Sequence, residues 1–186
     1  MRLLLIGKNG QLGFELRRAL APLGEVFGVD FPECDLAQPA SIQAIVAQVN
    51  PHVIVNAAAY TAVDKAESEP ALARAINAAA PGLLGEAARR IGARVIHYST
   101  DYVYDGAKRT PYREDDATGP LGIYGLTKRD GDAALAASGA DYFVFRTSWV
   151  FGAHGGNFVK TILRLAAERD RLAIVYSDPD PAVGPS

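Results

Sequence analysis

Gly7-Lys8-Asn9-Gly10-Gln11-Leu12-Gly13 follows a short apolar run, Leu3 to Ile6, and opens a stretch with helical periodicity. In such a strand-to-helix turn, Gly7 permits the tight turn and Gly10 lets backbone approach a pyrophosphate, while Gly13 lets the helix lie close to the sheet. Gln11 and Leu12 then contribute the first helical amides. Glycine-rich turns also arise for purely structural reasons, so the loop alone is a weak signal. Between a strand and a helix, it predicts a dinucleotide-binding α/β domain.

The rest of the chain repeats this alternation of short apolar and longer amphipathic runs, which is typical of parallel strands joined by crossover helices. We therefore expect a doubly wound parallel sheet, a Rossmann fold, with six strands. The expected strands are Leu3 to Ile6, Glu25 to Val29, Val53 to Asn56, Arg94 to Tyr98, Tyr142 to Arg146 and Leu172 to Val175. The expected helices are Gln11 to Ala21, Pro39 to Val49, Glu69 to Ile91, Leu126 to Ala137 and Asn157 to Glu168.

Composition narrows the class of partner. The 186 residues are 49% hydrophobic, which is enough for a substantial core, and the net charge of −2 indicates neither nucleic acid nor an anionic membrane surface as a partner. The single cysteine, Cys34, cannot form an internal disulfide, and no apolar run has the length of a membrane span. We expect a cytoplasmic protein with a small-molecule partner. The three histidines are scattered, no metal-ligand spacing is present, and no metal is expected.

Asp30 ends the second expected strand, about 20 residues after the glycine loop, where the fold places an acid for the ribose hydroxyls. A surface turn is the competing explanation. Asp30 would repel the 2′-phosphate of NADPH, whereas Lys8 would attract it, so both NADH and NADPH stay open. Asp35 and Leu36 suit the adenine edge, although Asp35 serves equally well in a turn that caps the next helix.

Small side chains follow the third expected strand in Ala57, Ala58, Ala59, Tyr60 and Thr61, and would let a cofactor lie against backbone. Tight packing of a helix on a strand explains them equally well. Trp149, the only tryptophan, follows the fifth expected strand. It would stack on a sugar or base, although a lone aromatic is more often part of a core.

Tyr124 and Lys128 stand four residues apart at the start of an expected helix, and so lie on one face of it. An ammonium beside a phenol favours the phenolate, so we expect the pKa of Tyr124 to be lowered and the pair to serve acid–base catalysis. Thr100 follows the fourth strand and offers a hydroxyl to a substrate carbonyl, with Asp101 beside it; the alternative is that Ser99 and Thr100 only bond local backbone.

These motifs together resemble the extended short-chain dehydrogenases, and within them the dTDP-4-dehydrorhamnose reductases. The resemblance runs from Arg2 to about Val175 and includes NAAAYTAVDKAESEP from Asn56, HYSTDYVY from His97, YGLTK from Tyr124 and RTSWVF from Arg146. It implies NAD(P)H-dependent reduction of dTDP-4-dehydro-L-rhamnose to dTDP-L-rhamnose. Tyr124 would then protonate the alkoxide, and Lys128 would hold the nicotinamide ribose. Both residues would also bind the cofactor. Thr100, Asp101 and Trp149 would contact the sugar nucleotide. A homodimer stays open.

Relatives of the dehydratase type carry Thr-Asp-Glu where this chain has Thr100, Asp101 and Tyr102, which argues for simple reduction. We expect a dinucleotide-binding domain over residues 1–176 and a disordered tail over 177–186, which is rich in proline. The substrate-binding lobe of the family would then be largely missing and turnover feeble. A regulatory subunit similar to that of methionine adenosyltransferase, and an inactive truncated remnant, are the alternative hypotheses.

Overall fold

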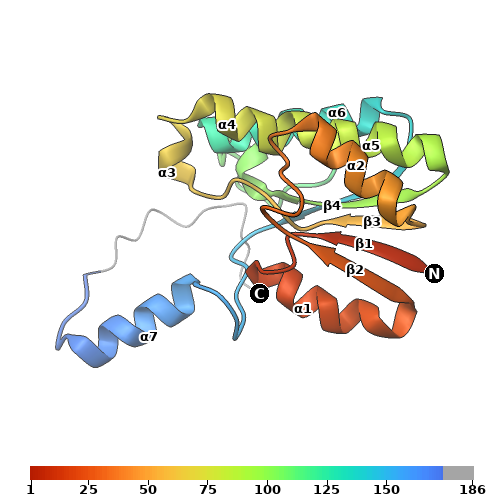
Figure 1. Cartoon of the computed structure of the whole chain (residues 1–186). Helices are drawn as coiled ribbons and strands as arrows, with labels where there is room; N and C mark the ends of the chain where they lie inside the picture. The colour runs from red at the N-terminus through yellow and green to blue at the C-terminus, as the bar shows by residue number, and fades with distance from the viewer. Residues whose placement is uncertain (174–186) are drawn as a thin grey trace.

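The computed structural model describes residues 1–173, which form a five-stranded parallel sheet with helices on both faces (Figure 1). The strands are β1 (Arg2–Ile6), β2 (Glu25–Val29), β3 (Val53–Asn56), β4 (Arg94–Thr100) and β5 (Asp141–Thr147), in the order β2-β1-β3-β4-β5. Because the connection after β2 carries the chain back across β1 to β3, the order reverses at β1. In open sheets of this kind, ligands bind where the order reverses, beyond the carboxyl ends of the strands.

Two apolar clusters hold the helices to the sheet. On one face, Leu4, Ile6 and Ile54 pack with residues of α2 (Pro39–Val49), α5 (Ala80–Ile91) and α6 (Ile123–Ala137). On the other face, Leu3 and Leu5 pack with Leu20 of α1 (Gln11–Leu20). Successive strand residues point to opposite faces, so the unbroken apolar run of β1 serves both clusters. Figure 1 shows α1 below the sheet, and α2, α5 and α6 above it.

The expected Rossmann-type fold is confirmed, and the helix expected from Glu69 to Ile91 is interrupted. It consists of α4 (Pro70–Arg74), a π-helical turn (Ala75–Ala79) and α5. The π turn places Asn77, which is 1% exposed, inside the protein. Its side chain donates to the carbonyl of Tyr60 and accepts from the N–H of Tyr60, so it fixes the loop after β3. A short helix that we did not expect, α3 (Val63–Ala66), follows that loop.

The end of the described chain differs most from expectation. The helix α7 (Phe158–Glu168) has the expected extent, with Asn157 as its N-cap, but none of its residues is buried and Figure 1 shows it standing apart from the sheet. Of the sixth strand expected at Leu172 to Val175, Leu172 and Ala173 have no regular secondary structure. The rest of that strand and the tail lie outside the described residues. Within residues 1–173, no helix is long and apolar enough to cross a bilayer.

Candidate active site

A cleft of about 690 Å³ lies along the carboxyl ends of all five strands. Gly7, Asp30 and Ala57 line it from just beyond β1, β2 and β3, while Thr100 and Thr147 line it from the last positions of β4 and β5. Tyr124 and Lys128 of α6 also line this cleft. The glycine loop and the expected catalytic residues are therefore brought into one cavity, although up to 121 residues separate them in sequence (from Gly7 to Lys128). Residues 1–173 hold no group of three His, Cys, Asp or Glu side chains arranged for a metal.

The three loop glycines have different roles. Gly7 has a φ of +87°, and a Cβ there would lie 2.7 Å from the backbone nitrogen of Ala58. A Cβ on Gly13 would lie 1.9 Å from the carbonyl oxygen of Gly7, so helix and loop touch backbone to backbone. A Cβ on Gly10 would meet only that same oxygen, at 3.5 Å, which is ordinary contact. Gly7 and Gly13 are thus required by packing, whereas Gly10 leaves room beside the helix N-terminus.

Asp30 follows the last residue of β2 and lines the cleft. Its carboxylate accepts hydrogen bonds from the backbone N–H groups of Asn9 and Phe31, both at 2.9 Å. The acid is therefore fixed against the glycine loop rather than left in a free surface turn. Carboxylate oxygens have further lone pairs, so Asp30 retains the capacity to accept from a ribose hydroxyl.

The segment after β5 returns to the glycine loop. Gln11 donates from its side chain to the carbonyl of Val150, and the side chain of Asn157 donates to Gln11. Trp149 lies in this segment with a φ of +51°; it is 63% exposed and lines the cleft. Its exposure rules out the core position that a lone tryptophan most often takes. Gly155 and Gly156, which we had not singled out, line the cleft as well.

Tyr124 lies in the first turn of α6, which begins three residues earlier than expected. Burial raises the pKa of the Tyr124 hydroxyl; hydrogen bonding with Thr100 opposes this, and the charge of Asp101 adds to it. The expected lowering of this pKa by Lys128 is therefore wrong. The physical reason is that the ammonium points to β4 instead, while the phenol is desolvated. At neutral pH, Tyr124 is a protonated acid.

Lys128 is 1% exposed, and its Nζ lies 2.7 Å from the carbonyl oxygen of Tyr98, to which it donates, and 3.2 Å from His97 Nε2. Burial lowers the pKa of Lys128 to about 8, and the nearby charge of Asp132 opposes the shift. Burial, and then the charge of Lys128, hold the pKa of His97 well below its usual range. Because an ammonium can only donate, the neutral ring of His97 accepts through Nε2. His97 thus positions Lys128, a role that its sequence context did not reveal.

Polar contacts also fix the residues around Lys128. Ser99 lines the cleft, and its hydroxyl donates its proton to Asp132 Oδ2 at 2.9 Å. Thr100 donates to Asp101 Oδ1 at 3.1 Å and accepts from the N–H of Tyr102 at 3.2 Å. The hydroxyl of Thr100 is thereby oriented by its own turn, and its oxygen lies at the cleft.

Besides Gly13, whose role is in packing, three expected cofactor residues do not line the cleft. The carboxylate of Asp35 accepts a hydrogen bond from the N–H of Ala37, which agrees with the alternative that Asp35 serves in the turn before α2. Leu36 is buried in the core. Tyr60 donates to Glu69 at 2.7 Å, while its neighbours Ala57, Ala58, Ala59 and Thr61 line the cleft. We therefore leave Asp35, Leu36 and Tyr60 out of the proposed site. Their side chains satisfy local structural needs.

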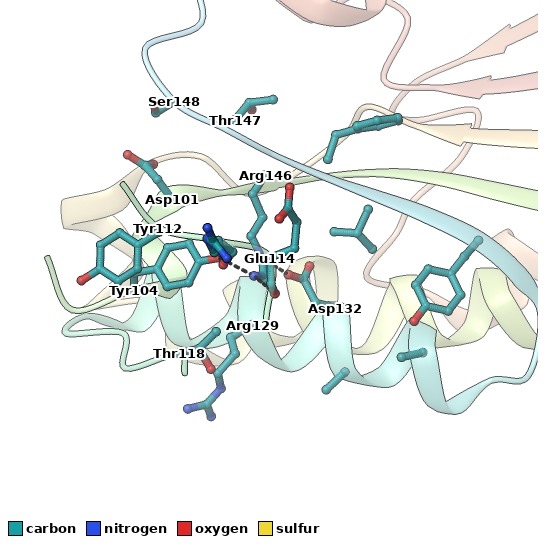
Figure 2. Close-up of a pocket in the computed structure, with 16 residues that line it drawn as sticks. Asp101, Tyr104, Tyr112, Glu114, Thr118, Arg129, Asp132, Arg146, Thr147 and Ser148 are labelled. Atoms are coloured by element: carbon teal, nitrogen blue, oxygen red, sulfur yellow. Dashed lines mark hydrogen bonds and ion pairs between the residues drawn. The ribbon is translucent and has the colours of Figure 1, made fainter. Parts of the chain in front are cut away.

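A second cavity of about 750 Å³ is lined mainly by residues of β5, of α6 and of the loop before α6, and it shares Asp101, Thr147 and Ser148 with the first (Figure 2). Arg146 crosses it and donates to the Tyr104 hydroxyl at 2.6 Å and to Asp132 Oδ2 at 3.4 Å. Although larger, this cavity contains neither the glycine loop nor Tyr124 or Lys128. The residues expected to bind the dinucleotide and to act in catalysis therefore meet at the smaller cleft.

The buried ammonium of Lys128 predicts a distinctive pH dependence of stability. Because the pKa falls from 10.5 to about 8 on folding, the unfolded chain binds the proton more tightly, and stability rises with pH between about 8 and 10.5. The shift corresponds to a cost of about 3 kcal/mol at pH 7. We expect wild type to gain about 2 kcal/mol more than Lys128→Met between about pH 7 and about pH 10, measured by urea unfolding.

Lys65→Met is the matched control for this measurement. Lys65 is exposed, and hydrogen bonding with Glu69 raises its pKa, so its removal has the opposite sign of pH dependence. Parallel stability curves for wild type and Lys128→Met would contradict the assignment of a buried, destabilising ammonium.

Comparison with known proteins agrees with the fold and the motifs. The dTDP-4-dehydrorhamnose reductases of Burkholderia thailandensis and Escherichia coli K12 are each 50% identical over 94% of this chain, and the match covers 59% and 60% of their own lengths. A crystal structure of such a reductase from Clostridium acetobutylicum matches 92% of this chain and 61% of its own with a TM-score of 0.89 and 39% identity. The crystal structure of the reductase from Bacillus anthracis, solved with NADP, matches 90% of this chain and 60% of its own, with a TM-score of 0.86 and 38% identity.

The chain thus spans about 60% of the length of these relatives. A family model described as the RmlD substrate binding domain matches residues 1–179, nearly the whole sequence. The chain belongs to this RmlD family.

Proposed function

We propose that this chain binds NADH or NADPH and carries the catalytic groups that reduce the 4-keto group of dTDP-4-dehydro-L-rhamnose to give dTDP-L-rhamnose. The observation that carries the proposal is the single cleft in which the glycine loop, Asp30, Thr100, Tyr124 and Lys128 meet. Relatives that carry the reductase name support the substrate class, and the relative solved with NADP supports the cofactor class.

The residues of the cleft fit a nicotinamide dinucleotide. Space beside Gly10 lies at the N-terminus of α1, where free backbone amides and the helix dipole favour the negative charge of a pyrophosphate. Asp30 stands at one end of the cleft, suited to a ribose hydroxyl, and Tyr124 and Lys128 stand at the other. When bound, the reduced nicotinamide would supply the hydride.

The chain's own groups would handle the proton. Tyr124, protonated because its pKa is raised, would donate its phenolic proton to the oxygen that becomes an alkoxide as the carbonyl is reduced. Thr100, oriented by Asp101 and Tyr102, would contact the same oxygen. Lys128 keeps one ammonium proton beyond those directed at Tyr98 and His97, and would use it to hold a ribose hydroxyl.

The test combines binding with a single turnover. NADH and NADPH are titrated into the purified chain, and the chain in excess over dTDP-4-dehydro-L-rhamnose is then followed by loss of reduced-nicotinamide absorbance and by product analysis. Stoichiometric dTDP-L-rhamnose supports the proposal. Tight dinucleotide binding without any hydride transfer, even in single turnover, would reject the catalytic part.

We further propose that the protein works in the cytoplasm on this small-molecule substrate. The buried free thiol of Cys34 and the use of a reduced dinucleotide both suit a reducing compartment. Fractionation of cells that express the tagged chain tests the location, since recovery with the membrane pellet would contradict it.

A further inference from the structure

An ion pair beside the adenosine end of the cleft bears on the choice between NADH and NADPH. Lys8, inside the glycine loop, places its Nζ 2.5 Å from Glu33 Oε2. The same carboxylate oxygen accepts a hydrogen bond at 3.0 Å from the backbone N–H of Asp30. Glu33 therefore ties the lysine of the loop to the end of β2, next to the acid that faces the cleft.

The lysine is held along its length. Gly28 of β2 lies under its stem, because a Cβ at Gly28 would come within 3.3 Å of Lys8 Cβ and 3.4 Å of Lys8 Cδ. The side chain of Lys8 is only 23% exposed, against 52% for Glu33. A stem already packed on backbone has lost most of its rotamer freedom, so its ammonium remains with Glu33 at little further entropic cost. Hydrogen bonding with Lys8, and then with the Asp30 N–H, holds the pKa of Glu33 below its usual range.

The charges around this point favour a hydroxyl over a phosphate. Asp30 and Glu33 contribute two carboxylates against the one ammonium of Lys8. A 2′-hydroxyl can donate to Asp30, whereas a 2′-phosphate brings further negative charge to a rim that is already net negative. Lys8, the cation that would attract the phosphate, is already neutralised by Glu33.

We infer that the Lys8–Glu33 pair makes this cleft selective for NADH over NADPH, and that Glu33 is the residue that sets the selectivity. The inference rests on the proposed function, because it requires Asp30 to face the adenosine ribose. It goes beyond that function in naming the preferred dinucleotide and the residue responsible.

Equilibrium titration of NADH and of NADPH into the whole chain, by calorimetry at one fixed ionic strength, tests the inference without any turnover. Wild type is expected to bind NADH about tenfold more tightly than NADPH. In Glu33→Gln the amide oxygen can still accept from the Asp30 N–H, but the negative charge that compensates Lys8 is lost. The ratio of the two dissociation constants is then expected to move about tenfold toward NADPH.

Glu25→Gln is the matched control, because it makes the same change of net charge at the opposite end of β2. Its ratio should stay that of wild type, since charges farther apart than the screening length interact little. Adding Lys8→Met to Glu33→Gln should abolish the gain, because methionine keeps the stem over Gly28 without the charge.

Lys8→Met alone gives a second test that does not depend on the folding of the Glu33 variant. Because Glu33 already compensates the charge of Lys8, losing that charge should change the ratio of the two dissociation constants by no more than about twofold. Equal or tighter NADPH binding by wild type, an unchanged ratio in Glu33→Gln, or a tenfold loss of NADPH affinity in Lys8→Met would each overturn the inference alone. Failure of wild type to bind either dinucleotide would instead reject the proposed function, and this inference with it.

Discussion

Replacing Tyr124 with phenylalanine is expected to slow single-turnover reduction of the 4-keto sugar by about a thousandfold, within the range for loss of a general acid. The phenol is partly buried, protonated and hydrogen-bonded with Thr100, so it is able to donate its proton. Phenylalanine keeps the ring and its edge-to-face contact with Tyr102, whose ring centroid lies 5.6 Å from that of Tyr124, and removes only the hydroxyl. The rate of nicotinamide oxidation is the measurement.

Tyr112→Phe serves as the control for this rate, because its hydroxyl donates to Asp105 outside the cleft. Because burial raises the pKa of Tyr124, the phenol stays protonated well above neutral pH, and the wild-type rate should first decline above about pH 8, where Lys128 loses the proton proposed to hold the ribose. A Tyr124→Phe rate within threefold of wild type, measured with dinucleotide bound, would remove Tyr124 from the mechanism.

Alanine at Gly10 and alanine at Gly13 are expected to fail in different ways. At Gly10 the φ of −68° is ordinary for any residue, and the new methyl group meets only one oxygen at 3.5 Å. The free energy of unfolding should therefore change by less than about 1 kcal/mol. The methyl group would, however, occupy the space proposed for the pyrophosphate, so dinucleotide affinity should fall about a hundredfold.

At Gly13 the methyl group would lie 1.9 Å from the carbonyl oxygen of Gly7, so the loop or the helix must move. We expect a loss of about 3 kcal/mol in stability together with loss of dinucleotide binding. Urea unfolding and calorimetric titration of the two variants separate these effects. Full dinucleotide affinity in Gly10→Ala would show that the pyrophosphate does not lie at this helix N-terminus.

Local patterns predicted most of the fold. The strand Glu25–Val29, the strand Val53–Asn56 and the helix Pro39–Val49 have the bounds expected from their periodicity. These elements are short, apolar on the faces that the core requires, and bounded on at least one side by glycine, proline or asparagine. The π turn at Ala75–Ala79 escaped prediction because it inserts into an otherwise regular helical pattern, and only the contacts of Asn77 reveal its purpose.

The candidate site could be predicted in part. Gly7, Gly10 and Asp30 line the cleft as their spacing predicted, because the first strand, turn and helix form a local unit. His97 and Glu33 could not be found in this way. His97 contacts Lys128, which is 31 residues away in sequence, and Glu33 contacts Lys8, which is 25 residues away. The residues next to His97 and Glu33 in sequence give no indication of these partners.

The amino-acid sequence by itself determined which elements form, because apolar periodicity and turn residues act over a few neighbours. It also determined that a phosphate loop, a Tyr-x-x-x-Lys pair and the hydroxyls of Ser99 and Thr100 would meet at the carboxyl ends of the strands, because all strands of a parallel sheet end on the same side. Only the tertiary structure decided the charge states. Lys128 is directed at His97 rather than at Tyr124, and Lys8 is directed at Glu33, because burial and the nearest acceptor, not spacing along the chain, fix where an ammonium points.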